Sequence, residues 1–213
     1  MAFEATQSLC EHLLACPCDR TSQLSIAAWA LGQFLEKAAA DRAGSGIRVT
    51  GSQDAAGSAE VVINAMPGSA SLDALAGLAP QLTGKVLVDV ANATEFDSAG
   101  FASAPLYPGS SLAEEIQRAL PDVRVVKSLN TMHDSVMADP AELAIAPSAF
   151  VSGNGADAKK VVGSLLAELG WPPEWITDLG DVRTARVPEA FVLMVSGLVR
   201  ALGPVPFGMT IAR

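Results

Sequence analysis

Short apolar runs that end abruptly in polar or turn-forming residues are the feature that most limits how this chain can fold. Residues 61–66 and 85–90 each form such a run, and residues 123–129, 149–152 and 175–179 are further predicted strands. Stretches with helical spacing lie between them, at residues 69–78, 111–120 and 156–169. Strands that alternate with helices build repeated βαβ units. The sequence therefore predicts an α/β fold with a mostly parallel sheet and helices on both of its faces.

The composition supports this fold class and excludes several functions. Hydrophobic residues make up 50% of the chain but aromatic residues only 5%, a mixture that suits strands buried on both faces. A net charge of −9 offers no basic stripe for nucleic acid. The chain has no apolar run long enough to span a membrane, and it lacks the charged start of a signal peptide. We therefore expect a cytoplasmic protein that binds neither nucleic acid nor membrane.

The first part of the chain lacks the alternation of strand and helix patterns that the rest of the chain shows. Residues 23–42 have helical spacing after a potential cap at Thr21 or Ser22, and residues 44–46 end that pattern. Three cysteines, Cys10, Cys16 and Cys18, lie close together, but Cys16 and Cys18 are too close for the usual zinc spacing. We interpret them as reduced thiols and predict no metal site.

Other segments complete the predicted order of elements. Residues 47–50 are expected to form a short strand and residues 54–58 a brief helix or turn. The polar stretch 92–110 is long enough to be a functional loop. Residues 187–202 are expected to form one closing apolar helix.

One glycine-rich stretch matches the pattern that binds the pyrophosphate of a dinucleotide. Residues 153–158 follow a predicted strand and open a predicted helix, and Asp178 lies about twenty residues further on. However, Asp157 would lie in the first helical turn, where its charge would repel a pyrophosphate but would suit the helix dipole. We therefore interpret this stretch as a glycine-rich helix start.

A second turn lies where open parallel sheets bind ligands, at the carboxyl end of a strand. It consists of Ala65, Met66, Pro67, Gly68 and Ser69. Gly68 would allow close approach of the backbone to a ligand, and the following helix would direct free N–H groups outward. An ordinary turn between strand and helix is the alternative interpretation.

Polar residues also follow the next two predicted strands. Asn92 follows one, and Asn130 and Thr131 follow the other. Their amide and hydroxyl groups are candidates to fix a carboxamide or a ribose hydroxyl, although Asn and Thr also serve as caps and turns. His133 lies beside them and is a candidate proton donor, with a plain surface role as the alternative. No serine–histidine–aspartate order or paired-carboxylate signature stands out, so the sequence gives no support for hydrolase chemistry.

From about residue 46 to residue 213 the chain resembles the family of coenzyme F420-dependent NADP oxidoreductase-like proteins. The segments that carry the resemblance are residues 61–69, 84–92, 111–117, 125–131, 150–153, 169–171 and 178–181. The resemblance implies a Rossmann-like fold, an NADP(H) cofactor and hydride transfer to a small-molecule acceptor such as the deazaflavin F420 or another flavin-like compound. It also implies that residues 65–68 line the ribose and diphosphate, and that Asn92, Asn130 and Thr131 flank the nicotinamide.

The resemblance has one gap, at the start of the chain. The family's first strand, its G-x-G-x-x-G turn and the second strand that receives the 2′-phosphate have no visible counterpart in this sequence. We therefore predict an atypical segment over residues 1–22, followed by an N-terminally incomplete Rossmann-like domain over residues 23–213. The N-terminal segment or a second copy of the chain in a homo-oligomer would then cover the exposed sheet edge.

Two functions follow from this combination. The first is an NADP-dependent oxidoreductase that transfers hydride between NADP(H) and a small molecule. The alternative is a non-catalytic or truncated family member with weak or no nucleotide binding, because the loss of two or three charge-assisted hydrogen bonds would weaken affinity at least about a hundredfold.

Overall fold

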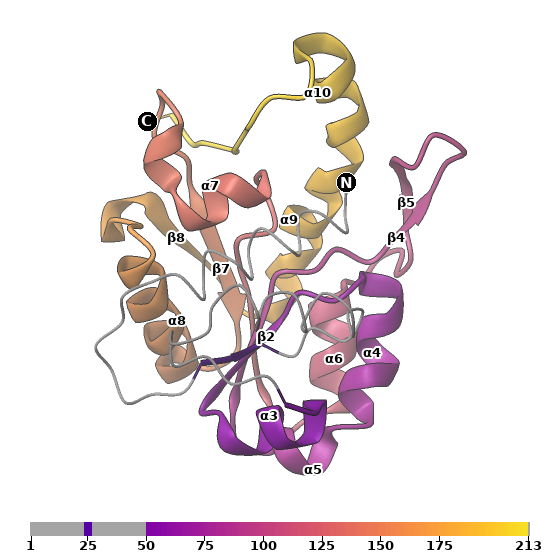
Figure 1. Ribbon diagram of the computed structural model, residues 1–213, viewed down its shortest axis with the longest axis vertical. Helices are drawn as coiled ribbons and strands as arrows, with labels where there is room; N and C mark the ends of the chain where they lie inside the picture. The colour runs from indigo at the N-terminus through magenta and orange to yellow at the C-terminus, as the bar shows by residue number, and fades with distance from the viewer. Residues whose placement is uncertain (1–23, 27–49, 213) are drawn as a thin grey trace.

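The computed structural model describes residues 24–26 and 50–212, and its centre is a six-stranded sheet (Figure 1). The strand order across this described sheet is β1-β2-β3-β6-β7-β8. Strands β1, β2, β3 and β6 run parallel, β7 runs antiparallel to β6, and β8 runs parallel to β7. Their bounds are β1 Leu24–Ile26, β2 Val61–Asn64, β3 Val86–Asp89, β6 Arg124–Lys127, β7 Ala149–Gly153 and β8 Ile176–Gly180. The mostly parallel sheet predicted from the apolar runs is confirmed.

Helices cover both faces of the sheet because side chains alternate along each buried strand. Val62, Leu87 and Val125 point into one apolar core, which also contains side chains of α3, α4, α5 and α6. Their neighbours Ile63, Val88 and Val126 point into a second core with side chains of α7 and α8. The helix bounds are α3 Ser52–Ser58, α4 Gly68–Ala76, α5 Ala79–Leu82, α6 Leu112–Ala119, α7 Asp134–Ala138 and α8 Ala156–Glu168. The two-faced arrangement expected from the sequence is therefore present.

The C-terminal part is less regular than predicted. In place of one helix over residues 187–202, the chain forms η3 Val182–Ala185, α9 Arg186–Ala190, η4 Phe191–Met194 and α10 Val195–Leu202. Shorter 3₁₀ turns lie at η1 Pro140–Glu142 and η2 Pro173–Trp175. After α10, which projects from the body in Figure 1, the chain returns to the segment that follows β6, where Gly208 and Met132 form an isolated antiparallel bridge.

The predicted loop over residues 92–110 contains regular structure. It forms an antiparallel hairpin of β4 Thr94–Phe96 and β5 Ala102–Pro105, which extends away from the main sheet (Figure 1). Gly100 has a φ of 80° in the turn, a conformation that glycine adopts without steric cost. The predicted functional loop thus contains a hairpin that the sequence pattern did not predict, because a turn glycine lets two short strands pair with each other.

The prediction of a helix over residues 23–42 is wrong at its start. Leu24–Ile26 forms strand β1, which pairs in parallel with Val61–Ile63 of β2. The free backbone groups along the edge of β2 outweigh the local helical pattern, because an unpaired strand edge gains hydrogen bonds from any extended segment that reaches it. The remainder of that predicted helix, the segment 1–22 with its cysteines, and residues 47–49 lie outside the described residues.

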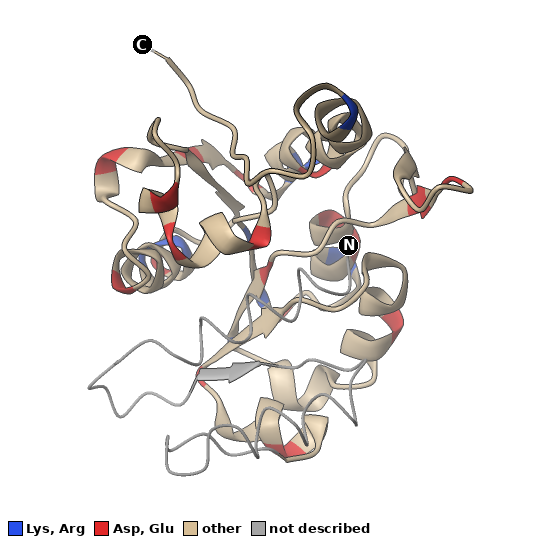
Figure 2. Ribbon diagram, turned by 45° about the horizontal axis from the view of Figure 1, so that its top comes forward, with Lys and Arg blue, Asp and Glu red and all other residues tan. Residues whose placement is uncertain are grey.

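The described part of the chain has a dispersed charge. Figure 2 shows acidic positions on most elements and scattered basic ones between them. Within residues 24–26 and 50–212, no group of three or more His, Cys, Asp or Glu side chains is placed to hold a metal ion. None of the helices in the same residues is long and apolar enough to cross a membrane.

Candidate functional site

Three buried polar side chains stand at the carboxyl ends of adjacent parallel strands, and we call this part of the sheet the carboxyl edge. Asn64 ends β2, Asp89 ends β3 and Lys127 ends β6, and strand pairing places them side by side in one row. Each is at most 1% exposed. The sequence interpretation did not single out these residues. A polar residue at the end of an otherwise apolar run was the signal that could have found them.

Lys127 is the centre of this row. Its ammonium donates to Asp89 Oδ2 over 2.9 Å and to the carbonyl oxygen of Ala91, and it lies 3.3 Å from Glu189 Oε2. These three acceptors match the three hydrogens of the ammonium. Burial alone would lower the pKa of Lys127, but the charges of Asp89 and Glu189 raise it above the ordinary value. The lysine is therefore a buried, fully partnered cation.

Asn64 and Asp89 extend the network to the neighbouring turns. The Asn64 amide nitrogen donates to Asp89 Oδ1 over 2.8 Å. Asn64 Oδ1 accepts from the Ser71 hydroxyl at 3.2 Å and from the Met66 N–H at 3.3 Å. Asp89 Oδ1 also accepts from the Ala91 N–H at 3.3 Å. The turn after β2 and the segment after β3 are thus held by the same buried group of side chains.

Glu189 brings a distant part of the chain to the carboxyl edge. It lies on α9, is 5% exposed, and accepts from the Leu112 N–H at 2.9 Å and from the Ala93 N–H at 3.4 Å. Burial raises the pKa of Glu189 above its ordinary value, and the positive charge of Lys127 opposes that shift. No local sequence pattern identified Glu189, because its bonding partners lie far away in the chain. Lys127, the nearest of these partners in sequence, is 62 residues away.

The predicted turn after β2 lies at this edge. Ala65 and Met66 are buried, Pro67 caps α4, Gly68 begins that helix, and Ser69 is exposed. A Cβ atom at Gly68 would lie 2.3 Å from the carbonyl oxygen of Asn92. Position 68 therefore requires a glycine for packing, because the segment after β3 occupies the space that a side chain would fill. The sequence analysis did not predict this role.

The structure brings Asn92 and Asn130 together. The Asn130 amide donates to Asn92 Oδ1 over 2.9 Å, and the Asn92 amide donates to the Asn130 carbonyl oxygen over 3.3 Å. Each amide nitrogen uses one of its two hydrogens in these bonds, which leaves a second hydrogen on each outside the pair. Thr131 is 1% exposed, and its carbonyl oxygen accepts from the Met209 N–H at 3.2 Å.

The segment that leads from β6 to Asn130 is strained. Leu129 has a φ of 59°, a conformation that is uncommon for a residue with a side chain. The preceding Ser128 hydroxyl is buried and has no hydrogen-bond partner among the described residues. Strained backbone and unpartnered buried polar atoms gather at functional sites more often than elsewhere. Both features therefore fit a ligand site beside the asparagine pair.

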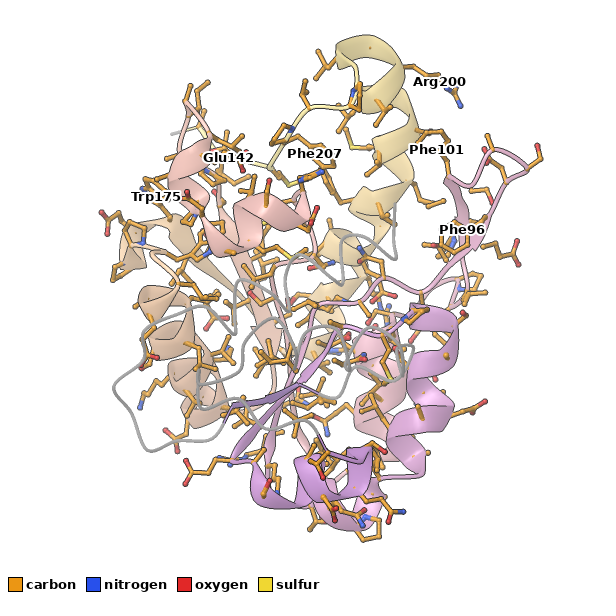
Figure 3. The ribbon with its side chains drawn as sticks, viewed as in Figure 1. Phe96, Phe101, Glu142, Trp175, Arg200 and Phe207 are labelled. Atoms are coloured by element: carbon orange, nitrogen blue, oxygen red, sulfur yellow. The ribbon has the colours of Figure 1, made fainter. Side chains whose placement is uncertain are left out.

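His133 lies at the rim of the carboxyl edge, where it begins α7. Its Nδ1 lies 3.0 Å from the Ser135 hydroxyl and accepts from the Ser135 N–H at 3.4 Å. Its ring meets the edge of Phe207 at a centroid distance of 6.1 Å, and Phe207 also contacts Phe191 at 6.1 Å. Figure 3 labels Phe207 on the C-terminal segment, which passes over this rim. One ring nitrogen of His133 thus serves as a helix cap.

The glycine-rich turn after β7 lies at the other end of the sheet, since β7 runs antiparallel to β6. Gly155 precedes the first residue of α8, as expected for a helix start. Asn154 Oδ1 accepts from the Val182 N–H at 3.1 Å. An open hollow of about 420 Å³ lies beside this turn, lined by Gln117, Pro121, Val123, Arg124, Asn154 and Gly155. This hollow is separate from the carboxyl edge, so we do not assign the predicted cofactor residues to it.

The parallel strands, the helices on both faces and the row of polar strand ends together define a Rossmann-like dinucleotide-binding fold. A family model described as NADP oxidoreductase coenzyme F420-dependent matches residues 7–93. The crystal structure of a candidate F420 dependent NADP-reductase from Arthrobacter sp. FB24 is 43% identical, with a TM-score of 0.70, and the match covers 76% of this chain and 72% of that one. The chain belongs to this F420-dependent NADP oxidoreductase family.

Two further relatives show how far this likeness extends. The F420-dependent NADP reductase of Methanocaldococcus jannaschii is 28% identical over 150 residues, and the match covers 68% of this chain and 65% of that protein. An imine reductase from Streptomyces aurantiacus shares the fold, with a TM-score of 0.59 at 14% identity, and the match covers 91% of this chain and 59% of that one. The chain thus spans just under two thirds of the length of the curated relative from Methanocaldococcus jannaschii.

Proposed function

We propose that the protein is an NADP-dependent oxidoreductase that transfers hydride between NADP(H) and a small planar acceptor such as a deazaflavin. The observation that carries this proposal is the hydrogen-bonded pair of Asn92 and Asn130 at the ends of adjacent parallel strands. Open α/β sheets bind nucleotides outside the carboxyl ends of their strands. The family name, which joins NADP to F420, supports the choice of cofactor and acceptor.

The residues present fit a nicotinamide. When bound, NADP(H) supplies or accepts the hydride, and the protein contributes orientation and electrostatics. The free amide hydrogens of Asn92 and Asn130 suit the oxygen of a carboxamide, and the unpartnered Ser128 hydroxyl lies two residues before Asn130. In this proposal Ala65, Met66, Pro67, Gly68 and Ser69 border the ribose and diphosphate, while Thr131 completes the nicotinamide side.

His133 takes a role on the acceptor side in this proposal. Its Nδ1 is engaged in capping α7, so only its Nε2 would face a small molecule. The partly exposed Phe207 beside it offers a flat apolar surface suited to an aromatic acceptor, and the buried Phe191 packs against Phe207. The histidine would donate a hydrogen bond to the acceptor and would take no part in forming a covalent intermediate.

A fluorescence titration of NADPH against the purified protein tests the cofactor. We expect saturation with a Kd below about 100 μM, followed by hydride transfer from NADPH to F420 or to a flavin, recorded as the change in their visible absorbance. Absence of binding at millimolar NADPH, with a folded circular-dichroism spectrum, would contradict the proposal and favour a protein without nucleotide affinity.

The substitution Asn130→Ala tests the site. It removes one candidate bond to the carboxamide and the bond that the Asn130 amide donates to Asn92 Oδ1, so we expect NADPH to bind about three- to tenfold more weakly. Asn154→Ala is the matched control, because the Asn154 side chain also makes one hydrogen bond, from the Val182 N–H, but lies at the other end of the sheet. Equal losses of affinity in the two variants would contradict a site at the carboxyl edge.

A further inference from the structure

The buried polar side chains beneath the carboxyl edge hold the backbone of the segments that surround the candidate cofactor site. We call Asn64, Asp89, Lys127 and Glu189 the strand-end cluster. Asn64 accepts from Met66 in the turn after β2, and Glu189 accepts from Leu112 at the start of α6. The cluster therefore connects segments that are far apart in the sequence and that meet at one place.

The strand-end cluster makes hydrogen bonds with the backbone of both residues that flank Asn92. On one side, the Ala91 carbonyl oxygen accepts from Lys127, and the Ala91 N–H donates to Asp89. On the other side, the Ala93 N–H donates to Glu189. The residues before and after Asn92 are thus fixed by charged groups from β3, β6 and α9, while the Asn92 side chain itself reaches Asn130.

We propose that Lys127 is a positioning residue, which sets the orientation of the Asn92–Asn130 pair by holding Ala91 and by keeping Asp89 and Glu189 in place. This proposal rests on the proposed function, because the pair matters only if it orients a nicotinamide. Lys127 does not reach the cofactor in this role, since its three hydrogens are directed at protein acceptors and it is 1% exposed.

The chemistry of the cluster favours a lysine at this place. Two carboxylates are buried beside one ammonium, so removal of the cation leaves negative charges without compensation. The released carboxylates and the freed Ala91 carbonyl would move to find other partners. A shift of about 1 Å in a group that orients a reacting ring is enough to reduce turnover about a hundredfold.

The test compares Lys127→Met with Lys159→Met. Lys159 is the control, because its ammonium also bonds one carboxylate, Asp178 at 2.8 Å, and one carbonyl oxygen, that of Gly180 at 3.2 Å, but its side chain is 17% exposed and these bonds do not involve the strand-end cluster. We expect Lys127→Met to lower kcat about tenfold or more while the Kd for NADPH changes less than about threefold. Lys159→Met should leave both within about twofold of wild type.

Hydrogen exchange gives a readout that does not depend on turnover. In Lys127→Met we expect the amides of residues 91–93 and 112 to exchange about tenfold faster than in wild type, with no such change in Lys159→Met. Since Lys127→Met could unfold the chain, Glu189→Gln is a milder variant of similar shape. It should speed exchange at residues 93 and 112 but not at residue 91, whose N–H donates to Asp89 and not to Glu189, and lower kcat about threefold.

Three results separate the outcomes. Unchanged kcat in folded Lys127→Met and in Glu189→Gln would overturn the positioning role, while normal wild-type turnover would leave the proposed function standing. Equal loss of kcat in Lys159→Met would also overturn it, because the effect would then be a general loss of stability. Failure of the wild-type protein to bind NADPH would instead overturn the proposed function itself.

Discussion

At the scale of single residues, Gly68 shows how a small side chain allows two segments of the carboxyl edge to meet. A Cβ atom there would lie 2.3 Å from the Asn92 carbonyl oxygen and 2.5 Å from the Ala93 Cα. We expect Gly68→Ala to destabilise the protein by about 1–3 kcal/mol, because the backbone must shift. Gly163→Ala is the control: it lies within α8 with open space around it, and it should stabilise by up to about 1 kcal/mol. Urea unfolding measures both, and equal effects would contradict the argument.

At the scale of elements, an ion pair joins α6 to α9. Arg186 Nε and Nη2 donate to the two oxygens of Glu114 at 2.7 and 2.6 Å, and the Glu114 side chain is 6% exposed. We expect Arg186→Met to lower the free energy of unfolding, because it leaves a buried carboxylate with a single hydroxyl partner. Arg183→Met, which breaks the exposed pair with Asp181, should lower it less. A larger loss for Arg183 than for Arg186 in urea unfolding would refute this ranking.

At the scale of the whole molecule, stability should decline in alkali. Burial first, and then the charges of Glu115, Asp73 and Glu189, raise the pKa of Tyr107 above its ordinary value of 10.0. The folded state therefore binds this proton more tightly than the unfolded state. The resulting stabilisation is complete below pH 10 and is lost as the pH rises through the folded pKa. Tyr107 is the only tyrosine of the chain, so tyrosinate absorbance measures it directly. If the pH midpoint of the Tyr107 titration in the folded protein were equal to or lower than the midpoint in concentrated urea, where the chain is unfolded, the raised pKa would be ruled out.

Much of the fold could be predicted from local pattern. The strand patterns predicted β2, β3, β6 and β7 nearly at their observed bounds, because these central strands are largely buried and mostly apolar. Strand β8 is only partly buried, but it also lies within one residue of its predicted bounds. The helical stretch predicted over residues 111–120 is α6, and Ser111 is its N-cap, where the hydroxyl accepts from the Glu114 N–H at 3.2 Å. The hairpin β4–β5 and the strand β1 were missed, since each depends on backbone pairing with a partner strand, which the helical spacing over residues 23–42 does not reveal.

The candidate site, like the fold, could be predicted from the sequence only in part. Asn92, Asn130 and Thr131 could be placed at one edge, because parallel strands end on the same side of a sheet. The pairing of Asn92 with Asn130 and the reason for Gly68 required coordinates, as both depend on how closely two strand ends approach each other. Whether these residues bind NADP(H) stays a prediction that the titration tests.

The sequence by itself determined the alternation of strands and helices and the family, because buried strands, helix caps and turns are local in their chemistry. Only the tertiary structure decided that Asn64, Asp89, Lys127 and Glu189 form one buried cluster. The hydrogen bonds of Glu189 join residues 77 and 96 positions apart in the chain. Charges can be buried only with such partners, and no spacing along the chain predicts which distant groups supply them.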